Sequence, residues 1–218
     1  IQAACSGFLF SATTGAKFIE SGAYKNVIVV GADKMSSITD YTDRSTCILF
    51  GDAAGAILLQ ANDQGFGLQD SWMRVDGVGA EFLHMKGGGS KNPPTHETVD
   101  KKWHYLFQDG KPVFKAAVKG MAEAVNEILK RNNLSPDDIR FVVPHQANLR
   151  IIQAVADYLK FPMERVMVNI QKYGNTTSAT IPFCLWEWED QLKPGNKVIL
   201  TSFGGGYTWG ASLWTWAY

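Results

Sequence analysis

The sequence has few of the features that mark several protein classes. It contains only three cysteines, Cys5, Cys47 and Cys184, which are odd in number and too far apart for a CxxC motif or a disulfide framework. Its 21 basic and 21 acidic residues cancel, so the positive field that non-specific nucleic-acid binding needs is missing. No apolar run approaches the roughly 20 residues that span a bilayer. We therefore expect a cytoplasmic protein without metal, nucleic-acid partner or membrane segment.

What remains is the composition of an ordinary globular protein. Hydrophobic residues make up 45% and charged residues 19% of the 218 positions, enough for a substantial core. The sequence opens at Ile1 with no Met and runs directly into the small apolar segment 3–8, as the middle of a domain does. We expect an N-terminal portion to be absent from this sequence, which would leave apolar sheet surface uncovered.

Hydrophobic periodicity predicts alternating strands and helices. The predicted strands are 27–30, 54–60, 65–75, 141–143, 166–168, 197–202 and 209–216, and the predicted helices are 7–20, 112–131, 149–159 and 176–191. Segment 77–102, with Gly87–Gly89 and Pro93–Pro94, is predicted to be a long surface excursion with a function. This alternation indicates an α/β fold around a buried mixed sheet.

Cys5 stands just before a predicted helix. A sulfur there lies near the positive end of the helix dipole, which favours the thiolate. A buried structural cysteine is an equally good interpretation of this residue alone.

His145 and Asn175 each stand at a predicted strand-to-helix junction, where open α/β sheets place their sites. Taken singly, a packed histidine and a helix-capping asparagine remain alternatives. Three further histidines lack metal-ligand spacing: His84, His96 and His104.

Gly204–Gly206 follows a strand with no helix after it, so it matches neither a dinucleotide fingerprint nor a P-loop. Consecutive glycines allow backbone N–H groups to approach a substrate oxygen. Together with Cys5, His145 and Asn175, they supply the parts needed for thioester chemistry on a cysteine.

Six segments, in this order, resemble β-ketoacyl-ACP synthase III, a condensing-enzyme family. They are Ala-Ala-Cys-Ser-Gly-Phe (3–8), Thr-Asp-Arg (42–44), Phe-Gly-Asp-Ala-Ala-Gly-Ala (50–56), Pro-His-Gln-Ala-Asn-Leu-Arg-Ile-Ile (144–152), Gly-Asn-Thr (174–176) and Phe-Gly-Gly-Gly-Tyr-Thr-Trp-Gly (203–210). The resemblance implies a thiolase-like fold of two similar halves, each a mixed five-stranded sheet layered with helices. Residues 1–75 would hold the end of the first half and the crossover, and residues 76–218 the second half.

The resemblance also implies the chemistry of an acyltransferase that starts type II fatty-acid synthesis. Cys5 would take an acyl group from acyl-CoA, with acetyl-CoA the expected donor. The N–H groups of Cys5 and Gly205 would form the oxyanion hole. Malonyl-ACP would then lose CO₂ and condense to 3-oxoacyl-ACP, while His145 and Asn175, as neutral donors, stabilise the enolate. No cofactor beyond these substrates is implied.

Binding residues follow from the same resemblance. Arg44 would pack on the CoA adenine, although Ser45 stands where many relatives have glycine. The acyl carrier protein would meet a surface with a basic patch, and a homodimer is expected. The residues assigned to that surface are Gln146, Ala147, Asn148, Leu149, Arg150 and Lys115. Asp157 and Tyr158 replace a lysine pair of some relatives, which predicts a weaker or shifted contact.

Two alternatives remain at this point. One is a related enzyme of secondary metabolism that condenses other acyl chains or only transfers them. The other is a non-catalytic partner subunit, against which the presence of Cys5, His145 and Asn175 argues.

Overall fold

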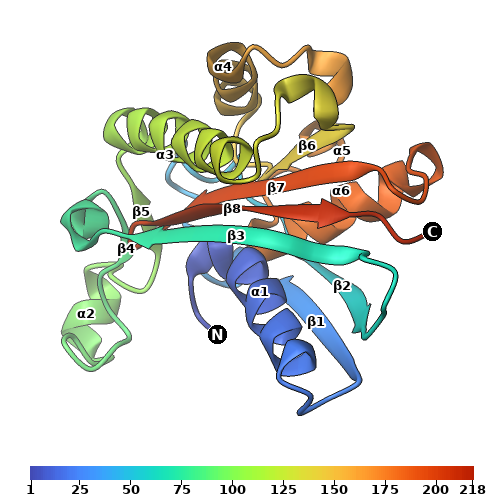
Figure 1. The fold of residues 1–218 in the computed structure, drawn as a ribbon. Coiled ribbons are helices and arrows are strands. Elements are labelled where there is room, and N and C mark those ends of the chain that lie inside the picture. Colours follow the sequence, from blue (N-terminus) through green and yellow to red (C-terminus); the bar gives the residue numbers. More distant parts are fainter.

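The computed structural model describes residues 1–218 and shows stacked layers of sheet and helix (Figure 1). The strands are β1 (Asn26–Asp33), β2 (Ala53–Gln60), β3 (Gly67–Val75), β4 (Leu83–Met85), β5 (Leu106–Gln108), β6 (Phe141–Pro144), β7 (Lys197–Gly204) and β8 (Thr208–Thr215). The α-helices are α1 (Gly7–Glu20), α2 (His96–Asp100), α3 (Gly110–Arg131), α4 (Leu149–Leu159), α5 (Ile170–Tyr173) and α6 (Thr180–Trp188). None of them is both long and apolar enough to cross a membrane.

The central layer is a four-stranded mixed sheet in the order β3-β8-β7-β6. β3, β8 and β7 are antiparallel neighbours, whereas β6 runs parallel to β7, with Val143 opposite Leu200. Helices α3 and α4 cover one face of this sheet (Figure 1). Helices α1 and α6 lie on its other face, where they separate it from the β1–β2 pair.

Strand alternation gives each face of the central sheet its own core. Val142 and Ile199 belong to the cluster under α3 and α4. Phe141, Val143 and Leu200 belong to the cluster with α1 and α6. β6 and β7 are therefore apolar on both faces, which is typical of strands buried between helical layers.

β1 and β2 form an antiparallel pair in which both faces carry apolar side chains, but only the inner face is covered. Their inner face packs on α1, where a Cβ at Gly15 would lie only 3.1 Å from the side chains of Val27 and Val29. Their outer face is also apolar, yet Ile28, Val30 and Leu58 are 70%, 55% and 56% exposed. The uncovered apolar sheet surface expected from the sequence is thus present in the structure.

Most predicted elements are found within a few residues of their expected bounds, but two differ. At the predicted strand 166–168 there is a single parallel bridge between Val166 and Val142. The chain turns away there because the Gln146 side-chain oxygen accepts the N–H groups of Asn169 and Ile170. The predicted helix 176–191 is also divided, with 3-10 turns at Thr177–Ala179 and Glu189–Gln191 flanking α6.

The predicted excursion has structure of its own. Residues 77–81 form a 3-10 turn, β4 and β5 make a short antiparallel hairpin, and α2 lies between those two strands in sequence. The hairpin returns the chain to Asp109, whose carboxylate accepts the N–H of Lys111 at 3.3 Å and caps α3. Pro112 stands in the first turn of that helix, as predicted.

Candidate active site

One cavity of about 670 Å³ collects the residues singled out in the sequence. Cys5, His145, Asn175 and Gly205 all line it, although they come from opposite ends of the chain. The cavity is mostly apolar, with a few polar side chains converging in it, which is the usual character of a small-molecule site.

Cys5 lies in a 3-10 turn (Ala4–Ser6) that leads directly into α1. Ala4 has φ 46°, a left-handed conformation that is strained for a residue with a side chain. Two hydrogen bonds fasten this turn to the start of β8: Ser6 Oγ donates to the Thr208 carbonyl at 3.1 Å, and Thr208 Oγ1 donates to the Ala3 carbonyl at 3.0 Å. The backbone that carries Cys5 is therefore held to Thr208 both before and after the cysteine.

The protonation state of Cys5 differs from the sequence-based expectation. Burial raises the pKa of the thiol to about 12, and the negative charge of Asp33 acts in the same direction. The hydrogen bond from its own backbone N–H lowers the pKa by less. Burial, the largest influence on this pKa, thus favours the thiol over the expected thiolate in the free protein.

Gly204 allows the glycine loop to pack against the Cys5 turn. A Cβ at this position would lie 2.8 Å from Cys5 N and 3.0 Å from Ser6 N, closer than real contacts allow. At Gly205, a Cβ would lie 3.7 Å from the Ala4 side chain. The close approach of these two backbones is what a pair of converging N–H donors requires.

His145 follows β6 at the carboxyl edge of the central sheet, as predicted, and it is fully buried. Its Nδ1 lies 2.7 Å from Thr180 Oγ1, whereas its Nε2 has no partner within the protein. Burial lowers the pKa of His145 to about 4, against the raising effects of the Thr177 backbone and Asp33. The ring is therefore neutral at pH 7, as expected, with one nitrogen free to serve a ligand.

Asn175 is buried beside the cavity and presents its amide nitrogen. Its Oδ1 accepts the N–H of Thr177 at 2.9 Å, which leaves the Nδ2 hydrogens as the available donors. Its backbone pairs with Leu49 and Gly51 at 2.9 Å each. The element before it is the short helix α5 rather than the predicted strand, and Gly174, at φ 67°, ends that helix.

The residues assigned to carrier-protein binding divide into two groups. Leu149, Arg150 and Lys115 are exposed, and Ala147 and Asn148 line the cavity. Gln146 is fully buried, and its amide nitrogen donates to the carbonyl groups of Pro144 and Met167. Its assignment to a docking surface is wrong, since it organises the loop from within.

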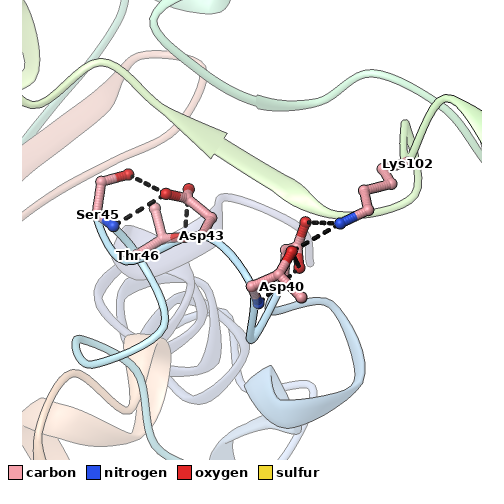
Figure 2. A network of polar contacts seen from close by, with 6 residues as sticks. Asp40, Asp43, Ser45, Thr46 and Lys102 are labelled. Carbon is pink, nitrogen blue, oxygen red and sulfur yellow. Dashed lines mark hydrogen bonds and ion pairs between the residues drawn. The ribbon is translucent and has the colours of Figure 1, made fainter.

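Arg44 is exposed and lies outside the cavity lining, although its neighbour Ser45 is part of it. The turn that carries Arg44 is built on Asp43 (Figure 2). The Asp43 carboxylate accepts the backbone N–H of Ser45 at 2.9 Å, its hydroxyl at 2.7 Å and the Thr46 hydroxyl at 2.8 Å. Arg44 therefore stands on an ordered turn, next in sequence to Ser45 of the cavity lining.

Lys102 joins the excursion to the start of this same turn (Figure 2). Its Nζ lies 2.9 Å from an Asp40 carboxylate oxygen and 2.7 Å from Thr42 Oγ1. Hydrogen bonds from Thr42 and Lys102 lower the pKa of Asp40 to about 2. A backbone bond from Leu106 N to the Ile38 carbonyl, at 2.8 Å, gives a second link. The excursion is thus a wall of the site.

No cluster for a metal ion is formed. Nowhere do three His, Cys, Asp or Glu side chains gather. His84 lines the cavity and packs on Phe107, with ring centroids 5.4 Å apart.

Sequence reasoning missed two residues that serve this site. Thr180 holds His145, and Asp33 reaches the cavity from the end of β1. A polar run, Asn-Thr-Thr-Ser-Ala-Thr at 175–180, was the available signal for Thr180. No pattern in the sequence indicated a role for Asp33, because its hydrogen-bond partners are distant in sequence.

Two family descriptions match separate parts of the chain. Residues 1–77 match "3-Oxoacyl-[acyl-carrier-protein (ACP)] synthase III", and residues 129–216 match "3-Oxoacyl-[acyl-carrier-protein (ACP)] synthase III C terminal". A beta-ketoacyl-[acyl-carrier-protein] synthase III from Koribacter versatilis is 54% identical over 222 residues, covering 100% of this chain and 67% of the relative. The chain belongs to this family.

Other members of the synthase III family agree with this assignment. The beta-ketoacyl-[acyl-carrier-protein] synthase III of Porphyromonas gingivalis is 56% identical over 218 residues, and the chain spans 65% of its length. The crystal structure of a 3-oxoacyl-(acyl carrier protein) synthase III from Pseudomonas aeruginosa PAO1 superposes with a TM-score of 0.91 at 36% identity, covering 100% of this chain and 67% of that one. The predicted thiolase-like α/β fold is confirmed, although the central sheet has four strands rather than the expected five, since Val166 makes only a single bridge to Val142.

Proposed function

We propose that this protein is an acyltransferase that begins type II fatty-acid synthesis, taking an acyl group from acyl-CoA, with acetyl-CoA the expected donor, onto Cys5 and condensing it with malonyl-ACP. The observation that carries the proposal is the convergence of Cys5, His145 and Asn175 in one cavity closed by the Gly204–Gly206 loop. The names of the relatives support it, since they are beta-ketoacyl-[acyl-carrier-protein] synthases III.

The first half-reaction needs a base because Cys5 is a neutral thiol. His145 Nε2 is unpartnered and faces the cavity, so it accepts the thiol proton as sulfur attacks the thioester carbon. The oxyanion forms beside the N–H groups of Cys5 and Gly205. When the tetrahedral intermediate collapses, the C–S bond to CoA breaks and the proton passes from Nε2 to the departing thiolate.

The second half-reaction places negative charge on the malonyl thioester oxygen as CO₂ leaves. Asn175 Nδ2–H is a ready donor to this oxygen, and His145 becomes one when Nε2 carries the proton. Both side chains are uncharged, so they favour the developing enolate without binding the ground-state carboxylate strongly. The carbanion attacks the acyl carbon on Cys5, the C–S bond breaks, and the released thiolate takes one proton from solvent to regenerate the thiol, because the Cys5 proton has already left with CoA.

The Thr180 hydroxyl can serve both tautomers that these steps require. Its oxygen lies 2.7 Å from His145 Nδ1 and 3.0 Å from the Thr177 carbonyl, and it has one proton to give. When the hydroxyl donates to the Thr177 carbonyl, its oxygen accepts from Nδ1–H, and Nε2 carries no hydrogen and can accept one. With the hydroxyl turned toward Nδ1, Nε2 carries the hydrogen and becomes a donor.

We infer further that the carrier protein docks on the exposed residues Leu149, Arg150 and Lys115 beside the cavity rim, reaching Ala147 and Asn148. Arg44 is the proposed contact for the CoA adenine. Reversal of charge in Arg150→Glu tests the docking: KM for malonyl-ACP is expected to rise while KM for acyl-CoA stays unchanged.

The remaining proposals concern the working form. We propose a cytoplasmic homodimer without a cofactor, divided into residues 1–75 and 76–218 as parts of the two halves. Sedimentation equilibrium tests the dimer, and activity that survives dialysis against EDTA tests the absence of a metal.

Intact-mass spectrometry with a panel of acyl-CoAs tests the activity itself. The expected result is one acyl adduct, located on the peptide that bears Cys5 and missing in Cys5→Ala. A folded, full-length gene product that forms no adduct with any donor refutes the proposal and favours a non-catalytic partner subunit.

A further inference from the structure

The turn Thr177–Thr180 carries the partners of both enolate-stabilising side chains. Thr177 N–H binds Asn175 Oδ1 at 2.9 Å, and Thr180 Oγ1 lies 2.7 Å from His145 Nδ1. Thr177 adopts φ 49°, a left-handed conformation that a β-branched residue keeps only when its surroundings impose it. Whatever fixes this turn also fixes the two catalytic side chains.

Asp33, at the end of β1, holds the middle of that turn. Its Oδ2 accepts the backbone N–H of Ser178 at 3.0 Å and also accepts the Ser178 hydroxyl. The two residues are 145 positions apart, with Asp33 at the end of β1 and Ser178 in the 3-10 turn Thr177–Ala179. A partly buried carboxylate with two donors on one residue is a strong anchor, because charge-assisted hydrogen bonds exceed neutral ones.

The backbone of β1 and the start of α1 complete this seat. A Cβ at Gly31 would lie 2.5 Å from the Ser178 carbonyl oxygen, so the turn rests directly on the strand. A Cβ at Gly7, the first residue of the helix after Cys5, would lie 3.7 Å from Ser178 Cβ. Ser178 is therefore fitted between the nucleophile's helix and β1.

We propose that Asp33 is a positioning residue, which anchors the Thr177–Thr180 turn through Ser178 and so sets His145 and Asn175 relative to Cys5. The proposal rests on the proposed function for the reaction it would affect. Asp33 also lines the cavity, and its charge raises the pKa of Cys5 and of His145, although burial is the larger influence on each. The Asp33 carboxylate is thus close enough to Cys5 and His145 for its charge to influence the ionisation of both.

Three variants in the full-length gene product separate the hydrogen bonds from the charge. Asp33→Ala removes both, Asp33→Asn keeps an oxygen that accepts from Ser178, and Ser178→Ala removes only the hydroxyl bond. The matched control is Asp52→Ala, because Asp52 binds Ser36 N at 2.7 Å and Ser36 Oγ at 2.6 Å in an exposed pair of the same kind.

Each half-reaction is measured separately, as acyl transfer to Cys5 and as condensation with malonyl-ACP. Asp33→Ala is expected to slow condensation about tenfold more than acyl transfer, since acyl transfer uses His145 alone whereas condensation uses both His145 and Asn175, which lose the same anchor. Asp33→Asn should restore the ratio to within about threefold of the original protein, Ser178→Ala should fall between them, and Asp52→Ala should leave the ratio unchanged.

A readout independent of activity is the ¹⁵N spectrum of the His145 ring, which reports its tautomer and its mobility. Asp33→Ala should alter this spectrum and Asp33→Asn should preserve it. The inference is overturned if Asp33→Ala lowers both half-reactions equally and leaves the spectrum unchanged, or if Asp33→Asn is as damaging as Asp33→Ala. Failure of the proposed function would appear differently, as no acyl adduct on the unaltered protein, and the spectrum would still decide the positioning.

Discussion

Thr180 Oγ1 lies 2.7 Å from His145 Nδ1 in a fully buried setting, and the same oxygen reaches the Thr177 carbonyl at 3.0 Å. This one hydroxyl therefore sets the orientation of the imidazole ring. It also sets whether Nε2, the nitrogen on the cavity side, carries a hydrogen. This gives the histidine both of its proposed roles without a charged residue in contact with its ring.

Thr180→Val keeps the shape of the side chain and removes this hydroxyl. We expect a decrease in kcat of about 10- to 100-fold, with a loss in the free energy of unfolding of about 1–3 kcal/mol, because Nδ1 is left buried without a partner. Steady-state kinetics and urea unfolding measure the two. Thr14→Val, which removes a hydroxyl bond to the Phe10 carbonyl in α1, is the control and should keep kcat.

The lowered pKa of His145 predicts how stability depends on pH. The folded protein binds this proton only near pH 4, whereas the unfolded chain binds it near 6.5, so stability from this group is complete above pH 6.5 and is lost as pH falls toward 4. The expected loss is about 3 kcal/mol. Urea unfolding at pH 7 and pH 4 measures it, and His145→Gln should reduce the difference by that amount; an unchanged difference would contradict the cause.

The raised pKa of Cys5 predicts slow alkylation of the free protein. Because the pKa of the thiol is raised to about 12, almost none of it is thiolate at pH 7.5, so its reaction with iodoacetamide should be slow there. The reaction should still accelerate above pH 9. Peptide mapping after timed labelling follows this residue alone. A rate that has levelled off by pH 8 would show that the thiolate is already formed.

Gly204→Ala tests the packing of the glycine loop on the nucleophile turn. The added Cβ would lie 2.8 Å from Cys5 N, so backbone must move, and we expect at least about tenfold slower acylation of Cys5 with a loss of about 1–3 kcal/mol in stability. Gly89→Ala is the control, since nothing lies within 4 Å of a Cβ there. Equal activity of the two variants would rule out the close approach.

Lys102→Met cuts the side-chain link between the excursion and the Arg44 turn. We expect KM for acyl-CoA to rise about two- to fivefold with kcat unchanged, because this turn loses a support but the catalytic residues do not. Lys101→Met is the matched control, since Lys101 pairs with Glu97 inside the excursion. Acyl-pantetheine, which lacks the nucleotide, should show no change in KM in either variant.

The sequence predicted the parts of the site better than the interactions among them. Motif and junction positions identified Cys5, His145 and Asn175, since each stands at an element boundary that local patterns mark. The bonds that tune them, from Thr180 and Asp33, join segments that no periodicity connects. The ionisation of Cys5 was missed because it depends on burial, which only the packed structure shows.

Errors in the fold have a similar origin. The strand expected at 166–168 was favoured by its apolar residues, yet the buried amide of Gln146 draws the following backbone away from the sheet. That same glutamine was assigned to the carrier-protein surface through the family resemblance, yet it is fully buried. A buried polar side chain that satisfies distant backbone groups gives no local signal.

The nucleophile turn at residues 4–6 is fastened to the start of the last strand, through Ser6 and Thr208, across a separation of 202 residues. Contacts of such range form late, since the intervening chain must first be ordered. The turn that carries Cys5 can therefore take its final position only once β8 has paired with β7, because both of its bonds go to Thr208. The surroundings of Cys5 thus depend on the packing of distant segments, and a state of the protein in which β8 is unpaired lacks the bonds that hold this turn.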